Sequence, residues 1–211
     1  MSIEIVCLPL GFTFTNTYLV GDSKTKEAVV IDPAWDGHLI LEEADKRGWD
    51  IKNIWLTHAH FDHLGGASGV SNGLNPPPKV ALHPDDRYMW DAKGGARMFG
   101  LQDIDPGPEP SIDLSQGQIL RLGKTEFEVR HAPGHTPGHV MFYCEPANVL
   151  FCGDVIFRTS IGRTDLPRGD HATLIDSIRT QVLTLPDDTR LLNGHGPETT
   201  VGFERANNPF L

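Results

Sequence analysis

Short apolar runs that end at turn-forming residues dominate the hydrophobic pattern of the chain and predict β-strands. Two longer segments, 39–47 and 172–185, repeat apolar residues every three or four positions and predict amphipathic helices. Gly48, directly after the first segment, is a typical helix stop. Shorter helices are predicted at 64–70 and 85–91. The predicted strands are 18–20, 28–32, 53–57, 79–82, 118–122, 126–131, 140–143, 149–152 and 190–193.

The order of these elements favours one architecture. Each half of the chain runs from several strands into a helix and a further strand, which predicts an α/β fold with two sheets and outer helices rather than one doubly wound sheet. A length of 211 residues fits a single domain, 1–211. Residues 92–112 contain three prolines and four glycines without a clear period and predict a long surface loop. Met98 and Phe99 in this loop either line a substrate pocket or pack the loop down.

Charge and cysteine content argue against several partners. The chain has 28 acidic and 18 basic residues, a formal net charge of -10, which disfavours nucleic acid and anionic membrane surfaces. Cys7, Cys144 and Cys152 form neither a disulfide framework nor a CxxC site. The first residues lack the pattern of a signal peptide, and no apolar run reaches the length of a membrane span. We therefore expect a cytoplasmic protein that acts on a small molecule.

A cluster of histidines follows the predicted strand at 53–57. The sequence HAHFDH places four metal-ligand side chains within six residues. His58 and His60 are two positions apart, so in an extended segment both rings project from one side and can share an ion. Asp62 and His63 are adjacent and must diverge. The spacing therefore predicts two ions, one on the histidine pair and one on Asp62 and His63, rather than solvated loop histidines.

Three further ligand-type side chains each follow a predicted strand and lie beside glycine. They are His135 in APGHTPGH, Asp154 in the run CGD and His195 in NGHGP. Seven ligands for two ions leave one residue to be shared, and a carboxylate can bridge with two oxygens. Asp154 is preferred as the shared ligand, because Asp62 already serves one ion beside His63. The predicted ligand sets are His58, His60, His135 and Asp154 for one ion and Asp62, His63, His195 and Asp154 for the other.

Asp62 and Asp154 are the candidate catalytic residues, and Asp62 could relay a proton while it binds metal. Asp32 ends an apolar strand before a proline and either orients a ligand imidazole or forms a simple turn. His139 is interpreted as a packed or hydrogen-bonded residue rather than a ligand. The candidates to hold a substrate carboxylate, or to form structural ion pairs, are Arg158, Arg163 and Arg168.

The motifs HAHFDH, GHTPGH, Gly153-Asp154 and Gly194-His195 together resemble the metallo-beta-lactamase superfamily. The stretches TNTYLV, VVIDP and GDVIFRTSIGRTDLPRGD are similar to small members of its glyoxalase II-like group, so the resemblance covers nearly the whole chain. It implies an alpha-beta-beta-alpha sandwich. It also implies hydrolysis of a small-molecule thioester of the hydroxyacylglutathione type by a hydroxide that bridges two divalent ions. Zinc is the first expectation for these ions, with iron or manganese as alternatives.

Two departures from the group bear on the thiol carrier. Glyoxalase II enzymes that hydrolyse S-D-lactoylglutathione carry a helical C-terminal extension that supplies part of the glutathione site, whereas this chain ends 16 residues after His195. The last ligand motif reads GHGPET where those enzymes usually have GHEYT. The resemblance therefore implies thioester hydrolysis and leaves glutathione open as the carrier.

The main alternative is a related persulfide dioxygenase with one iron, for which His58, His135 and Asp154 could supply the ligands. Those dioxygenases have a cysteine where this chain has His139, which favours the hydrolase. The expected lack of a signal peptide disfavours a secreted beta-lactamase, and the acidic charge disfavours an RNA-processing nuclease. A non-catalytic binding module would be expected to have lost ligands, and all seven are present.

Overall fold

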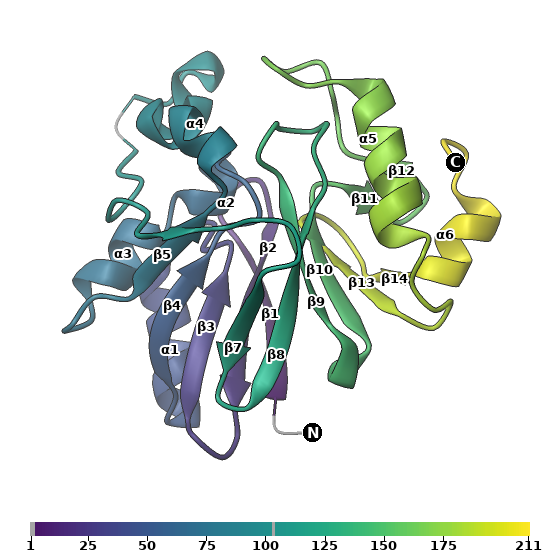
Figure 1. Ribbon diagram of the computed structural model, residues 1–211. Helices are drawn as coiled ribbons and strands as arrows, with labels where there is room; N and C mark the ends of the chain where they lie inside the picture. Colours follow the sequence, from purple (N-terminus) through teal and green to yellow (C-terminus); the bar gives the residue numbers. More distant parts are fainter. Residues whose placement is uncertain (1–2, 103) are drawn as a thin grey trace.

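The computed structural model describes residues 3–102 and 104–211, and two mixed β-sheets form its centre (Figure 1). The first sheet contains, in spatial order, β1 (Ile3–Leu10), β2 (Thr15–Asp22), β3 (Glu27–Ile31), β4 (Asp50–Trp55), β5 (Lys79–Leu82) and β6 (Ile112–Asp113). β1, β2 and β3 pair antiparallel, and β3 to β6 run parallel. The carboxyl ends of β3, β4 and β5 therefore meet at one edge of the sheet.

The second sheet has the same number of strands and also mixes both directions. It contains, in spatial order, β14 (Thr199–Thr200), β13 (Arg190–Asn193), β10 (Val149–Gly153), β9 (Val140–Cys144), β8 (Thr125–His131) and β7 (Ile119–Leu122). β10 and β13 run parallel, so their carboxyl ends lie side by side. A separate ribbon is formed by β11 (Ile156–Phe157) and β12 (Ser160–Ile161).

Helices cover the outer faces of both sheets (Figure 1). Their bounds are α1 (Gly37–Arg47), α2 (Phe61–Leu64), α3 (Ala67–Asn72), α4 (Arg87–Asp91), α5 (His171–Ser177) and α6 (Val201–Asn207). Figure 1 shows α1 and α3 outside the first sheet and α5 and α6 outside the second. This arrangement confirms the predicted α/β sandwich of two mixed sheets with outer helices.

The central strands bury both faces because each sheet lies between helices and the other sheet. In β3, Val29 and Ile31 pack in the layer between the sheets, whereas Ala28 and Val30 pack toward the helices. Such strands read as continuous apolar runs rather than alternating ones. The run AVVI in the sequence therefore already indicated a strand covered on both sides.

Helix α1 agrees well with its prediction. Ile40 and Ala44, four positions apart, are buried on one face. Gly48 adopts a left-handed conformation with φ 63° and donates its backbone N–H to the carbonyl oxygen of Asp45. The helix ends where the sequence predicts, and two residues separate it from β4.

The predicted helix at 64–70 is wrong in its bounds, because two short helices, α2 and α3, are separated by Gly65 and Gly66. A Cβ on Gly65 would lie 2.7 Å from the carbonyl oxygen of Ala34, and one on Gly66 would lie 2.8 Å from that of Pro33. The backbones approach so closely that only glycine fits. This contact sets the position of α2, which carries two of the predicted ligands.

The predicted loop at 92–112 is also only partly correct. Lys93–Phe99 forms 3-10 turns, and β6 pairs with β5 at the far end of the segment. Gly94 has φ 68° and packs so tightly on α2 that a Cβ would lie 2.2 Å from the backbone nitrogen of Phe61. Position 103 lies outside the described residues. Gly94, one of the glycines that suggested a surface loop, instead lets the first half of the segment pack against the start of α2.

Several elements had no clear pattern in the sequence. β1 lies at the edge of the first sheet, and α6 lies in a segment for which no helix was predicted. The predicted helix 172–185 is α5 followed by a π-helical turn at Ile178–Val182. Within the described ranges, no helix is both long enough and apolar enough to cross a membrane.

The layer between the sheets should dominate stability. Trp55 is 2% exposed, and its ring centroid lies 5.2 Å from that of Phe127 and 5.3 Å from that of Phe142. We predict that Trp55→Ala lowers the free energy of unfolding by about 3–5 kcal/mol in urea titrations. Ile119→Ala, at a position 47% exposed on β7, is the control and should cost less than about 1 kcal/mol. Equal losses would contradict this description of the core.

Candidate metal centre

The first four predicted ligands lie on the segment that leaves β4 and enters α2. His60 has an extended conformation with φ -70° and ψ 149°, and α2 begins at the next residue. His58 and His60 therefore precede the helix, whereas Asp62 and His63 lie in its first turn. The change from extended chain to helix turns Asp62 and His63 away from the pair of histidines before them. The spacing in the sequence predicts two separate groups for the same reason.

The other three ligand candidates come from the second sheet. His135 lies between β8 and β9, Asp154 follows β10 and His195 follows β13. Gly153 has φ 46°, and a Cβ on Gly194 would lie 2.2 Å from an Asp154 carboxylate oxygen. Because β10 and β13 are parallel neighbours, their ends deliver Asp154 and His195 together, and glycine leaves the space for both.

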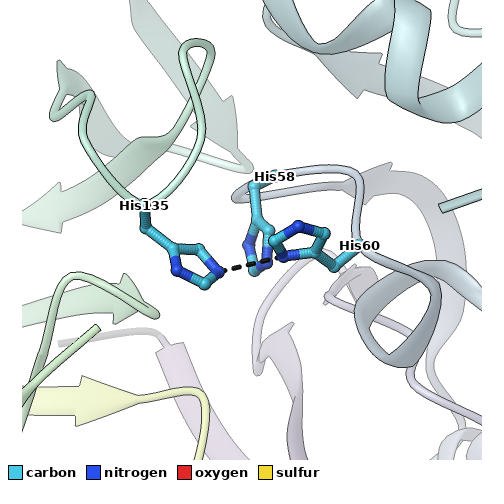
Figure 2. A group of neighbouring side chains, drawn as sticks. All are labelled: His58, His60 and His135. Atoms are coloured by element: carbon cyan, nitrogen blue, oxygen red, sulfur yellow. Dashed lines mark hydrogen bonds between the residues drawn. The ribbon is translucent and has the colours of Figure 1, made fainter. Parts of the chain in front are cut away.

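His58, His60 and His135 form the first group, whose candidate ligand atoms all lie within 4.8 Å of one another. Figure 2 shows the three imidazoles facing a common point, with His135 reaching it from the opposite sheet. His60 Nδ1 lies 2.9 Å from His135 Nε2. These three are the histidines of the first predicted ligand set.

Asp62, His63 and His195 form a second group of the same kind. His195 Nε2 lies 3.3 Å from Asp62 Oδ2, and His63 Nε2 lies 3.9 Å from the same oxygen. A third possible grouping joins Asp32, His58 and His63. Asp32 is already hydrogen-bonded to His63, so we interpret it as a support for that imidazole rather than as a metal ligand.

Asp154 lies between the two groups. Its Oδ2 is 3.6 Å from both His135 Nε2 in the first group and His195 Nε2 in the second. Its Oδ1 is 3.3 Å from His63 Nε2. The side chain therefore occupies the position that a ligand shared by two ions requires.

The donor atoms at this centre fit divalent metal ions. Buried polar groups normally have a hydrogen-bond partner, yet three atoms that face the two groups have none. They are the Nε2 atoms of His58 and His63 and the Oδ1 atom of Asp154. His60 presents its Nδ1 atom to the first group, beside His135 Nε2. Imidazole nitrogen and carboxylate oxygen are ligands for zinc, iron and manganese. Binding of metal would satisfy all three unpartnered atoms.

Hydrogen bonds on the side away from the centre orient three of the imidazole rings. Asp32 accepts hydrogen bonds from His63 Nδ1 at 2.9 Å and from the Thr57 hydroxyl and backbone N–H, both at 2.7 Å. Because the Thr57 hydroxyl donates to Asp32, it can accept from His58 Nδ1, 3.0 Å away. His135 Nδ1 donates to the Arg163 carbonyl oxygen at 2.7 Å. Each bond leaves Nε2 of the histidine facing the centre.

The charges differ between the two groups. Burial lowers the pKa of His60 to about 3, with a further contribution from His135, and lowers that of His58 well below its usual range. Burial also opposes protonation of His63 and His195, but Asp154 and Asp62 raise the pKa of both. His58 and His60 are therefore neutral, whereas His63 and His195 hold protons.

The pKa of Asp154 is set by the same opposition. Burial alone would raise it, but the charges of His63 and His195 hold it well below its usual range. The pKa of Asp62 is lowered in the same way by His63 and His195, against the effect of burial. Both carboxylates are therefore ionised at neutral pH and ready to bind cations.

The three candidate arginines occupy different environments. Arg163 lines the cavity at the centre, and its guanidinium is paired with Asp165, with both contacts at 2.7 Å. Arg158 lies over the ring of Phe203, 4.8 Å from the centroid, and Arg168 lies 3.9 Å above that of Tyr88. The last two are absent from the cavity wall and serve packing.

His139 and the two candidate loop residues are also placed by the structure. His139 is fully buried, stacks on His58 and accepts the Asp154 backbone N–H at 3.1 Å, so it supports two predicted ligands. Phe99 lines the cavity over the centre, whereas Met98 faces a separate cavity beside α4.

One supporting residue escaped the sequence analysis. The buried carboxylate of Asp86 accepts hydrogen bonds from Thr136 Oγ1 and Gly138 N, both at 2.7 Å, and from Ala59 N at 3.2 Å. It thereby joins the segment that carries His58 and His60 to the loop that carries His135. In the sequence, PDDR reads as an ordinary helix start, so no signal marked this role.

Comparisons with known proteins agree with this arrangement. The family model of the metallo-beta-lactamase superfamily matches residues 10–195. A protein of Haemophilus influenzae named hydroxyacylglutathione hydrolase GloC is 38% identical over 211 residues, which cover 100% of this chain and 98% of that protein. The chain therefore belongs to the metallo-beta-lactamase superfamily, as its motifs predicted.

Two solved structures are similar over nearly their full lengths. The crystal structure of BLEG-1 B3 metallo-beta-lactamase has a TM-score of 0.91 and 38% identity, with 99% of both chains covered. That of TTHA1623 in a di-iron-bound form has a TM-score of 0.88 and 39% identity, with 98% of this chain and 100% of that chain covered. A protein of related sequence and fold is thus known in a form that binds two iron ions.

The position of Asp154 leads to a test by substitution. We predict that Asp154→Asn lowers the metal content of both groups, because one carboxylate faces both. His195→Ala should deplete mainly the second group and leave about one ion per chain. Elemental analysis of dialysed protein measures both, with Asp188→Asn, an exposed position, as the control. Loss of only one ion in Asp154→Asn would show that Asp154 is not shared.

The unequal charges predict a stepwise release of metal in acid. Protons compete for a ligand below its pKa. The raised pKa values of His63 and His195 mean that protons displace metal from the second group at higher pH than from His58 and His60. Metal content should fall from about two ions per chain to about one before the remaining ion leaves, as pH is lowered from about 7.5. Simultaneous release of both ions would contradict this order.

Proposed function

We propose that the protein is a dinuclear metal-dependent hydrolase of small-molecule thioesters. The observation that carries the proposal is the Asp154 carboxylate, which faces both ligand groups on the floor of a cavity of about 600 Å³. The family is one of metal-dependent hydrolases, and a relative with 38% identity bears the name hydroxyacylglutathione hydrolase. Membership in the superfamily alone does not select thioesters, so the chemistry of the site must support that choice.

The residues of both groups would hold the ions, and divalent ions bound there lower the pKa of a coordinated water to about 7 and polarise a carbonyl oxygen. Hydrolysis then needs a route for the proton that the attacking water releases. Asp62 Oδ2 can accept this proton, because it faces the cavity and lies 3.3 Å from both His195 Nε2 and Thr15 Oγ1. The Thr15 hydroxyl holds the carboxylate in place.

The chemistry of the leaving group supports the choice of thioesters. A thiol has a pKa near 8.5, so it departs as a thiolate without a strong acid beside it. Among the described residues that line the cavity, the acidic side chains are Asp62 and Asp154, which are already ligand candidates. A site of this composition suits a substrate whose leaving group needs little protonation.

The choice of metal and compartment belongs to the same proposal. Histidine and aspartate suit zinc and iron alike, and the di-iron form of a protein 39% identical makes iron a serious candidate beside zinc. Cys7, Cys144 and Cys152 are free thiols, which is consistent with a reducing cytoplasm.

The dioxygenase alternative has less support from the geometry. One iron on His58, His135 and Asp154 would leave Asp62, His63 and His195 grouped without a purpose. These three side chains come from two sheets and meet beside Asp154, and the Nε2 atom of His63 has no hydrogen-bond partner. Both observations favour a second ion. The hydrolase accounts for both groups.

The experiment that tests the function offers acyl thioesters of several thiols to protein whose metal content has been measured. We predict release of free thiol without oxygen consumption, because hydrolysis changes no oxidation state. Exchange of glutathione for a smaller thiol carrier should change kcat/KM by less than about tenfold, because Arg163, the cation on the cavity wall, is already paired.

Three outcomes would contradict the proposal. Oxygen uptake with glutathione persulfide, without thioester cleavage, would identify the dioxygenase. Cleavage of penicillins or cephalosporins in the absence of thioester cleavage would identify a beta-lactamase. Thiol release that persists in Asp62→Asn and Asp154→Asn would show that the metal centre is not involved.

A further inference from the structure

Apolar side chains surround the opening above the metal centre. We call this set the apolar collar, and it consists of Phe12, Phe99, Phe157, Ile161 and Leu166. Phe12 is 62% exposed and Phe99 is 46% exposed. Large apolar side chains gathered around a cavity commonly mark a binding site, since each remains in water without a ligand.

The collar is preformed rather than loose. The ring of Phe61, buried beneath it, lies 5.0 Å from Phe99 and 6.3 Å from Phe12, centroid to centroid. Phe12 also packs on Trp35 at 5.4 Å, and Phe157 lies edge-on to His195 at 6.0 Å. These contacts with buried Phe61, partly buried Trp35 and His195 position Phe12, Phe99 and Phe157, so a ligand need not order the three rings on binding.

The described side chains around the collar disfavour an anionic substituent on the substrate, because they offer it no unpaired cation. The guanidinium of Arg163, which lies on the wall, is neutralised by Asp165 through two hydrogen bonds. Within the described part of the wall, an acyl carboxylate that extends into the collar would find apolar surface but no unpaired Lys or Arg.

We propose that the apolar collar is an acyl site, which selects thioesters whose acyl group is an apolar chain or ring. This inference rests on the proposed function and adds the substrate class to it. Thiols that carry acyl groups are themselves polar, so the apolar part of a thioester is the acyl group. With the carbonyl at the metal centre, that group extends into the collar.

The test compares thioesters of one neutral carrier, N-acetylcysteamine, with acetyl, butyryl, hexanoyl and succinyl groups. Each methylene that enters the collar should raise kcat/KM about threefold. The hexanoyl thioester, with four more methylenes, should then exceed the acetyl thioester by roughly 80-fold. The succinyl thioester should fall at least about tenfold below butyryl, because its carboxylate loses water in the collar without gaining an unpaired Lys or Arg there.

Substitutions in the collar test whether it causes the preference for hexanoyl over acetyl thioesters. Phe99→Ala and Phe12→Ala should each reduce the hexanoyl-to-acetyl ratio at least about fivefold, since both rings are proposed to contact the chain. Phe210→Ala is the matched control, because Phe210 is 49% exposed and lies outside the cavity wall. Its ratio should equal that of the unmodified protein.

A binding measurement separates failure of this proposal from failure of the proposed function. Calorimetry should show hexanoate binding at least about tenfold more tightly than acetate, with the difference reduced in Phe99→Ala. If no thioester is cleaved but hexanoate is preferred, the hydrolase proposal fails and the collar stands. If thioesters are cleaved with equal kcat/KM for acetyl and hexanoyl, the collar proposal is overturned.

Discussion

The buried carboxylate of Asp154 is the constraint on which the rest of the site depends. It lies between two groups of imidazoles, with Oδ2 3.6 Å from His135 and 3.6 Å from His195, and its Oδ1 has no hydrogen-bond partner. A charged group removed from water requires opposite charge nearby. Protonated His63 and His195 supply that charge without metal, and divalent ions would supply it in their place. The same carboxylate therefore links the stability of the centre to its capacity to bind metal.

The fold satisfies this constraint by fixing parts of the two sheets against each other. Asn16, at the start of β2, donates through its side chain to the carbonyl oxygens of Asn193 at 3.1 Å and Gly196 at 2.9 Å. Tyr18 OH donates to the same Asn193 oxygen at 2.7 Å. These bonds hold the loop that carries His195 against the first sheet, as Asp86 holds the loop that carries His135. The ligand positions thus depend on contacts between sheets and not on either sheet alone.

The sequence predicts the two-sheet architecture because buried strands leave apolar runs with clear ends. It also places the ligand candidates after those ends, and HAHFDH has a spacing that indicates two groups by itself. Contacts between distant segments leave no such record. Asp86 looks like a helix start in the sequence. The loop containing Phe99 looks irregular, although its Gly94 serves a close contact with α2. Arg158 and Arg168 carry the charge expected of substrate ligands, but tertiary packing turns them toward aromatic rings.

The central claim is that this site binds two metal ions that share Asp154, and anomalous X-ray scattering measures it most directly. Crystals of the metal-loaded protein should give two anomalous difference peaks. One should lie among His58, His60 and His135, the other among Asp62, His63 and His195, and the Asp154 carboxylate should contact both. A single peak at His58, His135 and Asp154, in protein saturated with metal, would contradict the account.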